Sequence, residues 1–231
     1  MILWDGGNND FPFYRPDLLV VVADPLRAGD ESRFHPGETN VRMADVVVIN
    51  KVDSADPADV ERLRRSIREL NPHAGVILAR SALSLVGGDI RGKRVVVVED
   101  GPTLTHGGMT FGAGVVAAQR FGAKELVDPR CCAVGSIEAV LMRYPRLGPL
   151  VPAMGYGAAQ TADLAATLNA IDADLVLSAT PIDLTRVLQL NKPVVRVRYE
   201  LEPIEGRSLT ELIAPMLARA HAGRRVDPVP A

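Results

Sequence analysis

Short apolar runs rich in Val, Ile and Leu recur along this chain, and they constrain its fold more than any other feature. Each run is continuous rather than alternating, so we expect both faces of each predicted strand to be buried. Parallel sheets have this pattern because helices cover them on both sides. The predicted strands cover residues 18–23, 46–49, 75–78, 94–98, 173–178 and 194–197.

Helical patterns separate several of these runs. The clearest covers Pro57–Leu70, where apolar residues recur at spacings of three and four. Asp56 can cap the start of this helix, and Pro57 suits its first turn. Further helices are predicted at residues 136–143 and 158–171 and from about residue 180. Strands alternating with helices predict an α/β fold with an open, mostly parallel sheet and flanking helices.

Composition narrows the class of partner and the compartment. The 231 residues carry a net charge of −2, which provides no broad positive field for nucleic acid or an anionic membrane. The cysteines, Cys131 and Cys132, are adjacent and cannot join distant segments or form a zinc site of the usual spacing. No secretory signal pattern or membrane-length apolar run occurs, so we expect a cytoplasmic protein.

The predicted strand at residues 46–49 leads directly into Asn50-Lys51-Val52-Asp53. Open α/β sheets bind ligands at the carboxyl ends of their strands, which is where this segment lies. It resembles the Asn-Lys-x-Asp loop of GTPases, and that resemblance implies that Asp53 accepts N–H groups of guanine, Lys51 lies along the base and Asn50 braces the loop. The alternative is an ordinary turn before a helix cap, because Asn and Asp are common there.

Two further segments extend the nucleotide-site hypothesis. Ser81 and Ala82 follow the strand at residues 75–78 and resemble the Ser-Ala element that contacts the base through a backbone N–H in GTPases. Asp5 ends a predicted strand, Ile2–Trp4, and resembles a Walker B carboxylate that holds Mg²⁺. Asp24, after the next strand, is a second candidate carboxylate. The alternative for Asp5 is a turn built from Gly, Asn and Asp.

A phosphate-binding loop of the form Gly-Lys-Ser or Gly-Lys-Thr is absent from the sequence. The chain also opens abruptly on its first predicted strand. We therefore expect either a truncated polypeptide whose preceding part carries this loop, or a protein that has lost ordinary NTP hydrolysis.

The segment after the strand at residues 94–98 is rich in Asp, Thr, His and Gly, and a helix is predicted after it. Its backbone N–H groups and the helix dipole can hold an anion. A histidine can donate to phosphate or transfer a proton near neutral pH. The predicted catalytic residues are Asp100 and His106, and the predicted substrate-binding residues are Gly101, Thr103, Thr105, Gly107 and Gly108. The alternative is a long structural turn with an incidental histidine.

Several short segments taken in order resemble the cyclic 2,3-diphosphoglycerate synthetase family over most of the chain, up to about Glu202. These segments are residues 4–10, 50–53, 99–109, 148–157, 180–184 and 191–193. The resemblance implies a ligase that uses ATP and Mg²⁺ to close 2,3-diphosphoglycerate, a small phosphorylated substrate, into a cyclic anhydride. The arginines that could neutralise its charge are Arg120, Arg130, Arg143 and Arg146.

The resemblance also predicts how the chain divides. We expect residues 1–90 to form the C-terminal half of a P-loop NTPase-like domain. Residues 91–205 are expected to form an α/β segment with the Gly-rich anion loop, and whether its strands continue the same sheet stays open. Residues 206–231 are expected to be a C-terminal helix and tail. The choice between ATP and GTP, the oligomeric state, and the alternatives of a related GTPase or a non-catalytic binding remnant stay open at this point.

Overall fold

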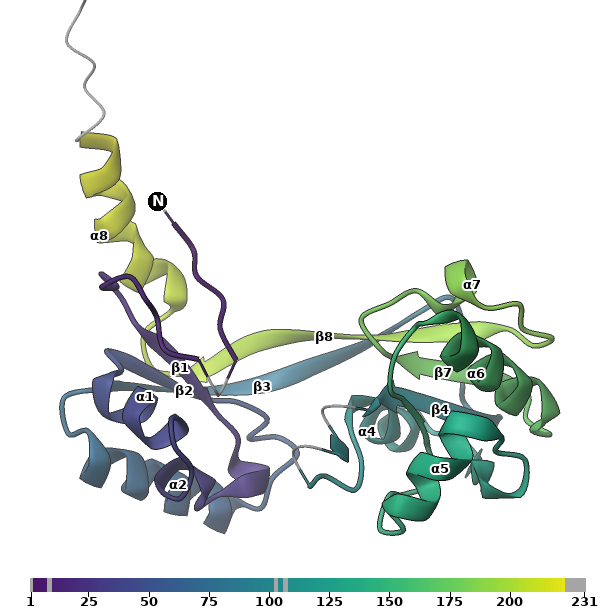
Figure 1. Cartoon of the computed structure of the whole chain (residues 1–231). Coiled ribbons are helices and arrows are strands. Elements are labelled where there is room, and N and C mark those ends of the chain that lie inside the picture. Colours follow the sequence, from purple (N-terminus) through teal and green to yellow (C-terminus); the bar gives the residue numbers. More distant parts are fainter. Residues whose placement is uncertain (1, 8–9, 102–103, 106–107, 223–231) are drawn as a thin grey trace, which may run out of the picture. The chain divides into compact units, whose positions relative to one another are not determined.

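A computed structural model of the chain describes residues 2–7, 10–101, 104–105 and 108–222 (Figure 1). They form two compact units: unit 1 takes the chain up to Ala82 and from Leu201 onward, and unit 2 takes Leu83–Glu200. The strand pairs described in both units are parallel, and helices flank them. The predicted α/β class with a mostly parallel sheet is therefore confirmed. The domain limits predicted at residues 90 and 205 stay a prediction.

Unit 1 contains three neighbouring parallel strands, β1 (Val20–Ala23), β2 (Val46–Ile49) and the first part of β3 (Gly75–Val86). In register, Ala23 lies beside Ile49, and Ile49 lies beside Leu78. The last residues of β1 and β2 are therefore level, so the segments that follow them emerge side by side at the carboxyl edge of the sheet.

Helices cover both faces of the unit 1 sheet. On one face, α1 (Gly37–Met43) and α2 (Pro57–Leu70) contribute buried apolar side chains, and on the other lies α8 (Leu209–Ala222) (Figure 1). The predicted start of α2 is confirmed, because the Asp56 carboxylate accepts a hydrogen bond from the backbone N of Ala58 at 2.8 Å. Two short 3-10 helices, η1 (Pro25–Arg27) and η2 (Asp30–Ser32), precede α1.

Unit 2 is built around β4 (Arg94–Asp100) and β7 (Leu175–Ala179), which pair with each other and are almost wholly buried. The first part of β8 (Val194–Glu205) pairs with β7, while β5 (Glu125–Leu126) and β6 (Val151–Ala153) pair with β4. The helices whose residues are all described in this unit are α4 (Ala113–Arg120), α5 (Gly135–Arg143), α6 (Ala158–Ala170) and α7 (Leu184–Val187), with the 3-10 helix η3 (Pro129–Cys131).

Three strand predictions are wrong in extent. Residues 2–7 form no strand, because no neighbouring strand pairs with them in the described part of the chain. β3 does not end at residue 78 and β8 does not end at residue 197; they continue to Val86 and Glu205. β3 and β8 are neighbours in the sheet, so each continues as a strand past polar positions that in the sequence look like strand ends.

The ion pair between Arg80 on β3 and Glu202 on β8 illustrates, within unit 1, how polar residues support the continued strands. The guanidinium Nε and Nη2 of Arg80 donate to the two carboxylate oxygens of Glu202 at 2.8 and 2.6 Å. Such exposed cross-strand pairs support a sheet without apolar burial. Among the described ranges, no helix is both long and apolar enough to cross a bilayer.

Candidate functional site

The loop Asn50–Asp53 lies at the carboxyl edge of the unit 1 sheet, directly after the buried strand β2. Its backbone is fixed on both sides: Asn50 N donates to Ala23 O at 3.0 Å, and Val52 N donates to Ala79 O at 3.2 Å. Lys51 has a φ of 60°, the left-handed conformation that non-glycine residues rarely adopt. A conformation of this kind persists where the surrounding structure holds it, and it is enriched at ligand sites.

The Lys51 side chain is held by a carboxylate from the neighbouring strand end. Its Nζ lies 2.6 Å from Asp24 Oδ2, while Asp24 Oδ1 accepts a hydrogen bond from Leu26 N at 3.0 Å. Both oxygens of Asp24, which is half-buried, are therefore engaged. Asp24 thus braces the Asn50–Asp53 loop, and a metal ion would have to compete with Lys51 for this carboxylate.

The remaining polar groups of the loop differ in their surroundings. Asn50 Oδ1 is buried and accepts no hydrogen bond, and such a group is costly unless a ligand or water completes it. Asp53 is exposed, and its charge acts on the Arg80–Glu202 pair. The hydrogen bond that Arg80 donates to Glu202 is the main cause that raises the pKa of Arg80, and the negative charge of Asp53 raises this pKa further. The Asp53 carboxylate therefore lies close enough to the Arg80 guanidinium for their charges to interact.

Three other predicted nucleotide-site residues belong to other segments of the chain. Ser81 and Ala82 stand within β3 rather than after it, and their predicted contact with a nucleotide base stays a prediction. Asp5 is exposed on an irregular segment and does not end a strand. In the part of the chain that is described, no cluster of three or more His, Cys, Asp or Glu side chains is placed to bind a metal. The role of Asp5 toward Mg²⁺ stays a prediction.

In unit 2, the predicted anion loop leaves the carboxyl end of β4. Asp100 is the last residue of the strand, and Gly101 and Thr105 have helical backbone. A Cβ on Gly101 would lie 2.9 Å from Ala153 O, so glycine is needed there for packing against the end of β6. The Thr105 hydroxyl donates to Gly101 O at 3.0 Å, and Gly108 is exposed with a φ of 63°. Thr103, His106 and Gly107 lie outside the described residues.

Glu99, which sequence reasoning did not assign to the site, occupies the helix end that was predicted to hold an anion. Its Oε1 accepts hydrogen bonds from the backbone N of Gly114 and of Val115, at 2.8 and 3.0 Å, at the start of α4. The protein's own carboxyl group therefore takes these two N–H groups, while the predicted binding of a substrate anion by the residue 100–108 loop stays a prediction. An acidic residue at the end of a Val run, before Gly and Pro, was the available signal.

The surroundings of Glu99 determine its protonation. The residue is 3% exposed. Burial raises its pKa to about 7, although the backbone N–H groups of Val115, Gly114 and Gly112 act in the opposite direction. The charge of Asp100 raises it further. Glu99 can therefore exchange a proton near neutral pH, directly beside the predicted catalytic residue Asp100.

Arg130, one of the four candidate arginines, is committed within the fold. Arg130 donates through Nη1 to both carboxylate oxygens of Asp128, at 3.0 and 2.8 Å, and through Nη2 to Leu147 O at 2.6 Å. The Arg143 guanidinium lies 5.6 Å from the ring centre of Tyr144. Arg130 therefore fastens the segment before β6, which makes it a poor candidate for holding substrate.

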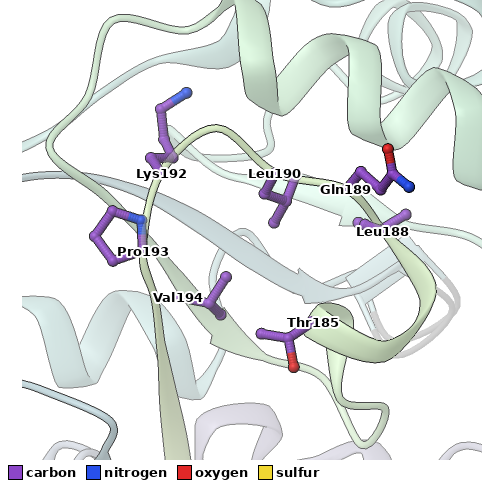
Figure 2. Close-up of a pocket in the computed structure, with 7 residues that line it drawn as sticks. All are labelled: Thr185, Leu188, Gln189, Leu190, Lys192, Pro193 and Val194. Atoms are coloured by element: carbon purple, nitrogen blue, oxygen red, sulfur yellow. The ribbon is translucent and has the colours of Figure 1, made fainter.

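A cavity of about 420 Å³ lies elsewhere in unit 2, beside the segment that connects α7 to β8 (Figure 2). Its lining residues are Thr185, Leu188, Gln189, Leu190, Lys192, Pro193 and Val194. The Lys192 ammonium already donates to Leu168 O at 2.7 Å and to Asn191 Oδ1 at 2.8 Å. Because the cavity adjoins the amino end of β8 rather than the carboxyl ends of β4 and β7, it does not coincide with the expected ligand edge.

Comparison with known proteins connects this geometry to nucleotide-binding domains and synthetases. Residues 8–78, within unit 1, match the model of the CobW/HypB/UreG nucleotide-binding domain. Arginine synthetase ArcE of Thermococcus kodakarensis is 56% identical over 214 residues, which is 92% of this chain and 48% of that protein. The similarity therefore extends over both units, and this chain spans about half the length of that relative.

Two more distant relatives match shorter stretches. A cyclic 2,3-diphosphoglycerate synthetase of Pyrococcus furiosus is 26% identical over 96 residues, or 42% of this chain and 22% of that protein. A probable hydrogenase maturation factor HypB of Methanocaldococcus jannaschii is 36% identical over 61 residues, or 26% of this chain and 27% of that protein. The predicted resemblance to cyclic 2,3-diphosphoglycerate synthetase is thus distant and covers less of the chain than expected.

Proposed function

We propose that this chain is part of a nucleotide-dependent synthetase whose product is arginine. In this proposal unit 1 binds the base of the nucleotide and unit 2 carries residues that act on the substrate. The observation that carries it is the 56% identity to an arginine synthetase, which covers 92% of this chain. The activity belongs to the whole protein, since this chain spans 48% of that relative.

The loop Asn50–Asp53 supports the nucleotide part of the proposal. It combines a left-handed Lys51, a brace from Asp24 and an unpartnered, buried Asn50 Oδ1 at a carboxyl sheet edge. Its exposed Asp53 carboxylate can accept two parallel N–H groups, which guanine offers and adenine does not. GTP is therefore the nucleotide that this loop favours, and ATP is the alternative that the resemblance to synthetases supplies.

A shared chemical step links the arginine and cyclic diphosphoglycerate synthetases in this proposal. To convert a ureido side chain into a guanidinium, ammonia must replace the ureido oxygen, which leaves readily once a phosphoryl group is attached to it. Closing a phosphate anhydride likewise requires one phosphate to be activated for attack by another. In either case NTP would become NDP and inorganic phosphate, and a bound Mg²⁺ would supply charge neutralisation at the transferring phosphoryl group.

The assay for this proposal measures nucleoside diphosphate release by the full-length protein with Mg²⁺ and either ATP or GTP. We expect release to require both ammonia and the amino acid that carries a ureido group in place of the guanidinium of arginine, with one arginine formed per diphosphate. Release that depends instead on 2,3-diphosphoglycerate would mean that the protein forms the cyclic diphosphoglycerate, the reaction named for its more distant relative. Diphosphate release that depends on neither substrate would indicate a GTPase. No release would indicate a non-catalytic protein that only binds its ligand.

Asp53→Ala is expected to remove the preference for guanine over adenine nucleotides, because the paired acceptors for the base are lost. The ratio of the two dissociation constants should fall by roughly a hundredfold or more, as at other sites built on paired hydrogen bonds. Calorimetric titration with GDP and ADP measures both constants.

Asp56→Ala is the matched control for this variant. It removes a carboxylate three residues farther along, which caps α2 through Ala58 N. We expect it to lower stability by about 1 kcal/mol and to leave the affinity ratio unchanged. Equal ratios in Asp53→Ala and the unaltered protein would show that the loop is a structural turn.

A further inference from the structure

The two adjacent cysteines form a thiol pair in the segment between β5 and α5 of unit 2. Their Sγ atoms lie 3.0 Å apart. Cys131 is exposed, whereas Cys132 is half-buried and packs against the unit 2 core. The thiols therefore face the same side of the chain, with one accessible to a reagent and the other sheltered behind it.

The backbone on either side of the pair is fastened. Asp128 caps η3 by accepting from Arg130 N at 3.0 Å, and Cys132 N donates to Pro129 O at 3.0 Å. Arg130 ties the same segment to Leu147 O at 2.6 Å. These contacts fix the backbone that carries the two thiols, and the Cys131 thiol also donates to Asp128 O at 3.7 Å.

We propose that Cys131 and Cys132 form a reversible vicinal disulfide on reaction with a hydroperoxide. The exposed Cys131 thiolate attacks the peroxide oxygen and becomes a sulfenic acid, with loss of one water when the peroxide is hydrogen peroxide. The Cys132 sulfur then attacks the Cys131 sulfur and displaces its hydroxyl as a second water. Two thiols are oxidised to one disulfide, and one hydrogen peroxide is reduced to two waters.

This division of roles follows from exposure. Redox-sensing cysteines are accessible and stand next to a resolving cysteine. Hydrogen bonding to Cys131, together with burial, raises the pKa of Cys132, which suits that thiol to the second, resolving step. The close Sγ···Sγ approach makes the second step intramolecular, so it competes well with further oxidation of the sulfenic acid.

The same adjacency makes the disulfide easy to reduce. Neighbouring Cα atoms are about 3.8 Å apart, below the roughly 4.4 Å at which ordinary disulfide spans begin. Strained disulfides have higher reduction potentials than structural ones and are labile. A vicinal bond at this position therefore suits a modification that is made and removed, rather than a permanent crosslink.

Mass spectrometry of the whole chain treated with a small excess of hydrogen peroxide tests the proposal. Trypsin cleaves after Arg130 and Arg143, so both cysteines fall in one peptide. We expect this peptide to lose two hydrogen atoms, to regain them with dithiothreitol, and to come from a chain that remains unlinked on a non-reducing gel.

Cys131→Ser and Cys132→Ser are the matched controls, and neither should give the internal disulfide. Cys132→Ser should accumulate over-oxidised Cys131 or disulfide-linked pairs of chains, because the resolving thiol is gone. The proposal is overturned if the unaltered chain itself yields linked pairs or sulfinic acid at Cys131 with Cys132 still reduced. It is equally overturned if neither thiol reacts while the chain is folded.

Discussion

Asn71→Ala should lower the free energy of unfolding of unit 1 by about 4 kcal/mol, because one buried side chain satisfies five backbone groups. Asn71 is 8% exposed and follows α2. Its Nδ2 donates to the carbonyl oxygens of Val41, Arg42 and Ala44 at 2.9, 3.1 and 2.8 Å. Its Oδ1 accepts from the backbone N of His73 and of Ala74, both at 3.2 Å.

Alanine removes the side-chain partner of all five groups in a place that water enters poorly. Val41 O still accepts from Ala44 N, and Ala74 N still donates to the backbone oxygen of residue 71, but the other three groups lose the partner named here. The three carbonyls belong to the end of α1, so the same variant should loosen α1 against the strands. Hydrogen exchange of the β2 amides in increasing urea measures the loss in unit 1 without relying on unit 2.

Asn169→Ala is the comparison for this variant. Asn169 Nδ2 donates to Gln189 O at 3.0 Å and its Oδ1 accepts from Asn191 N at 2.9 Å, but these bonds are exposed. Water can replace them, and we expect a loss of about 1 kcal/mol, confined to unit 2. If the two variants lose similar stability, the burial of Asn71 is not what makes its bonds important.

Glu99→Gln should remove a pH dependence of unit 2 stability that the unaltered protein shows between about pH 4.5 and pH 7. The folded pKa of about 7 lies above the ordinary value of 4.5 because the carboxyl is buried. The folded state therefore binds more protons than the unfolded state in this window, and stability falls as pH rises. Each pKa unit corresponds to about 1.4 kcal/mol, which gives up to about 3 kcal/mol in total.

Glutamine keeps an oxygen that can accept from Gly114 N and Val115 N, but it does not titrate. We expect the stability of Glu99→Gln relative to the unaltered protein to increase as pH rises from 5 to 8. Its own stability should change less with pH over this range. Hydrogen exchange of β4 and β7 amides across this range measures it. Glu138→Gln, at an exposed position on α5, controls for removing a carboxylate from unit 2. Parallel curves for Glu99→Gln and the unaltered protein would exclude Glu99 as the titrating group.

Some parts of the structure follow from local sequence because the interactions that produce them are local. The run Val46–Ile49 predicted a strand buried on both faces, and Asp56-Pro57 predicted the start of α2; both are confirmed. The position of Asn50–Asp53 at a carboxyl sheet edge follows from the same run. β5 and β6 were not predicted, because segments of two and three residues carry no periodicity and exist through pairing with β4.

Other parts of the candidate site depend on residues that are distant in sequence. Asp24 and Lys51 are brought together because β1 and β2 end level with each other in the sheet. Glu99 meets Gly114 and Val115 only because α4 packs back against the strand that carries Glu99. The continuation of β3 past residue 78 depends on its neighbour β8, and this is what moves Ser81 and Ala82 out of a loop.

The recurring apolar runs by themselves determined the α/β class and the edge of the sheet at which polar segments emerge, because burial on both faces permits little else. Only the tertiary structure decided how those polar groups are used: Asp24 braces Lys51, and Glu99 fills the helix end that sequence had offered to a substrate. The physical reason is that a sequence shows which groups can donate, accept or carry charge. Which partner each group meets depends on strand register and helix packing.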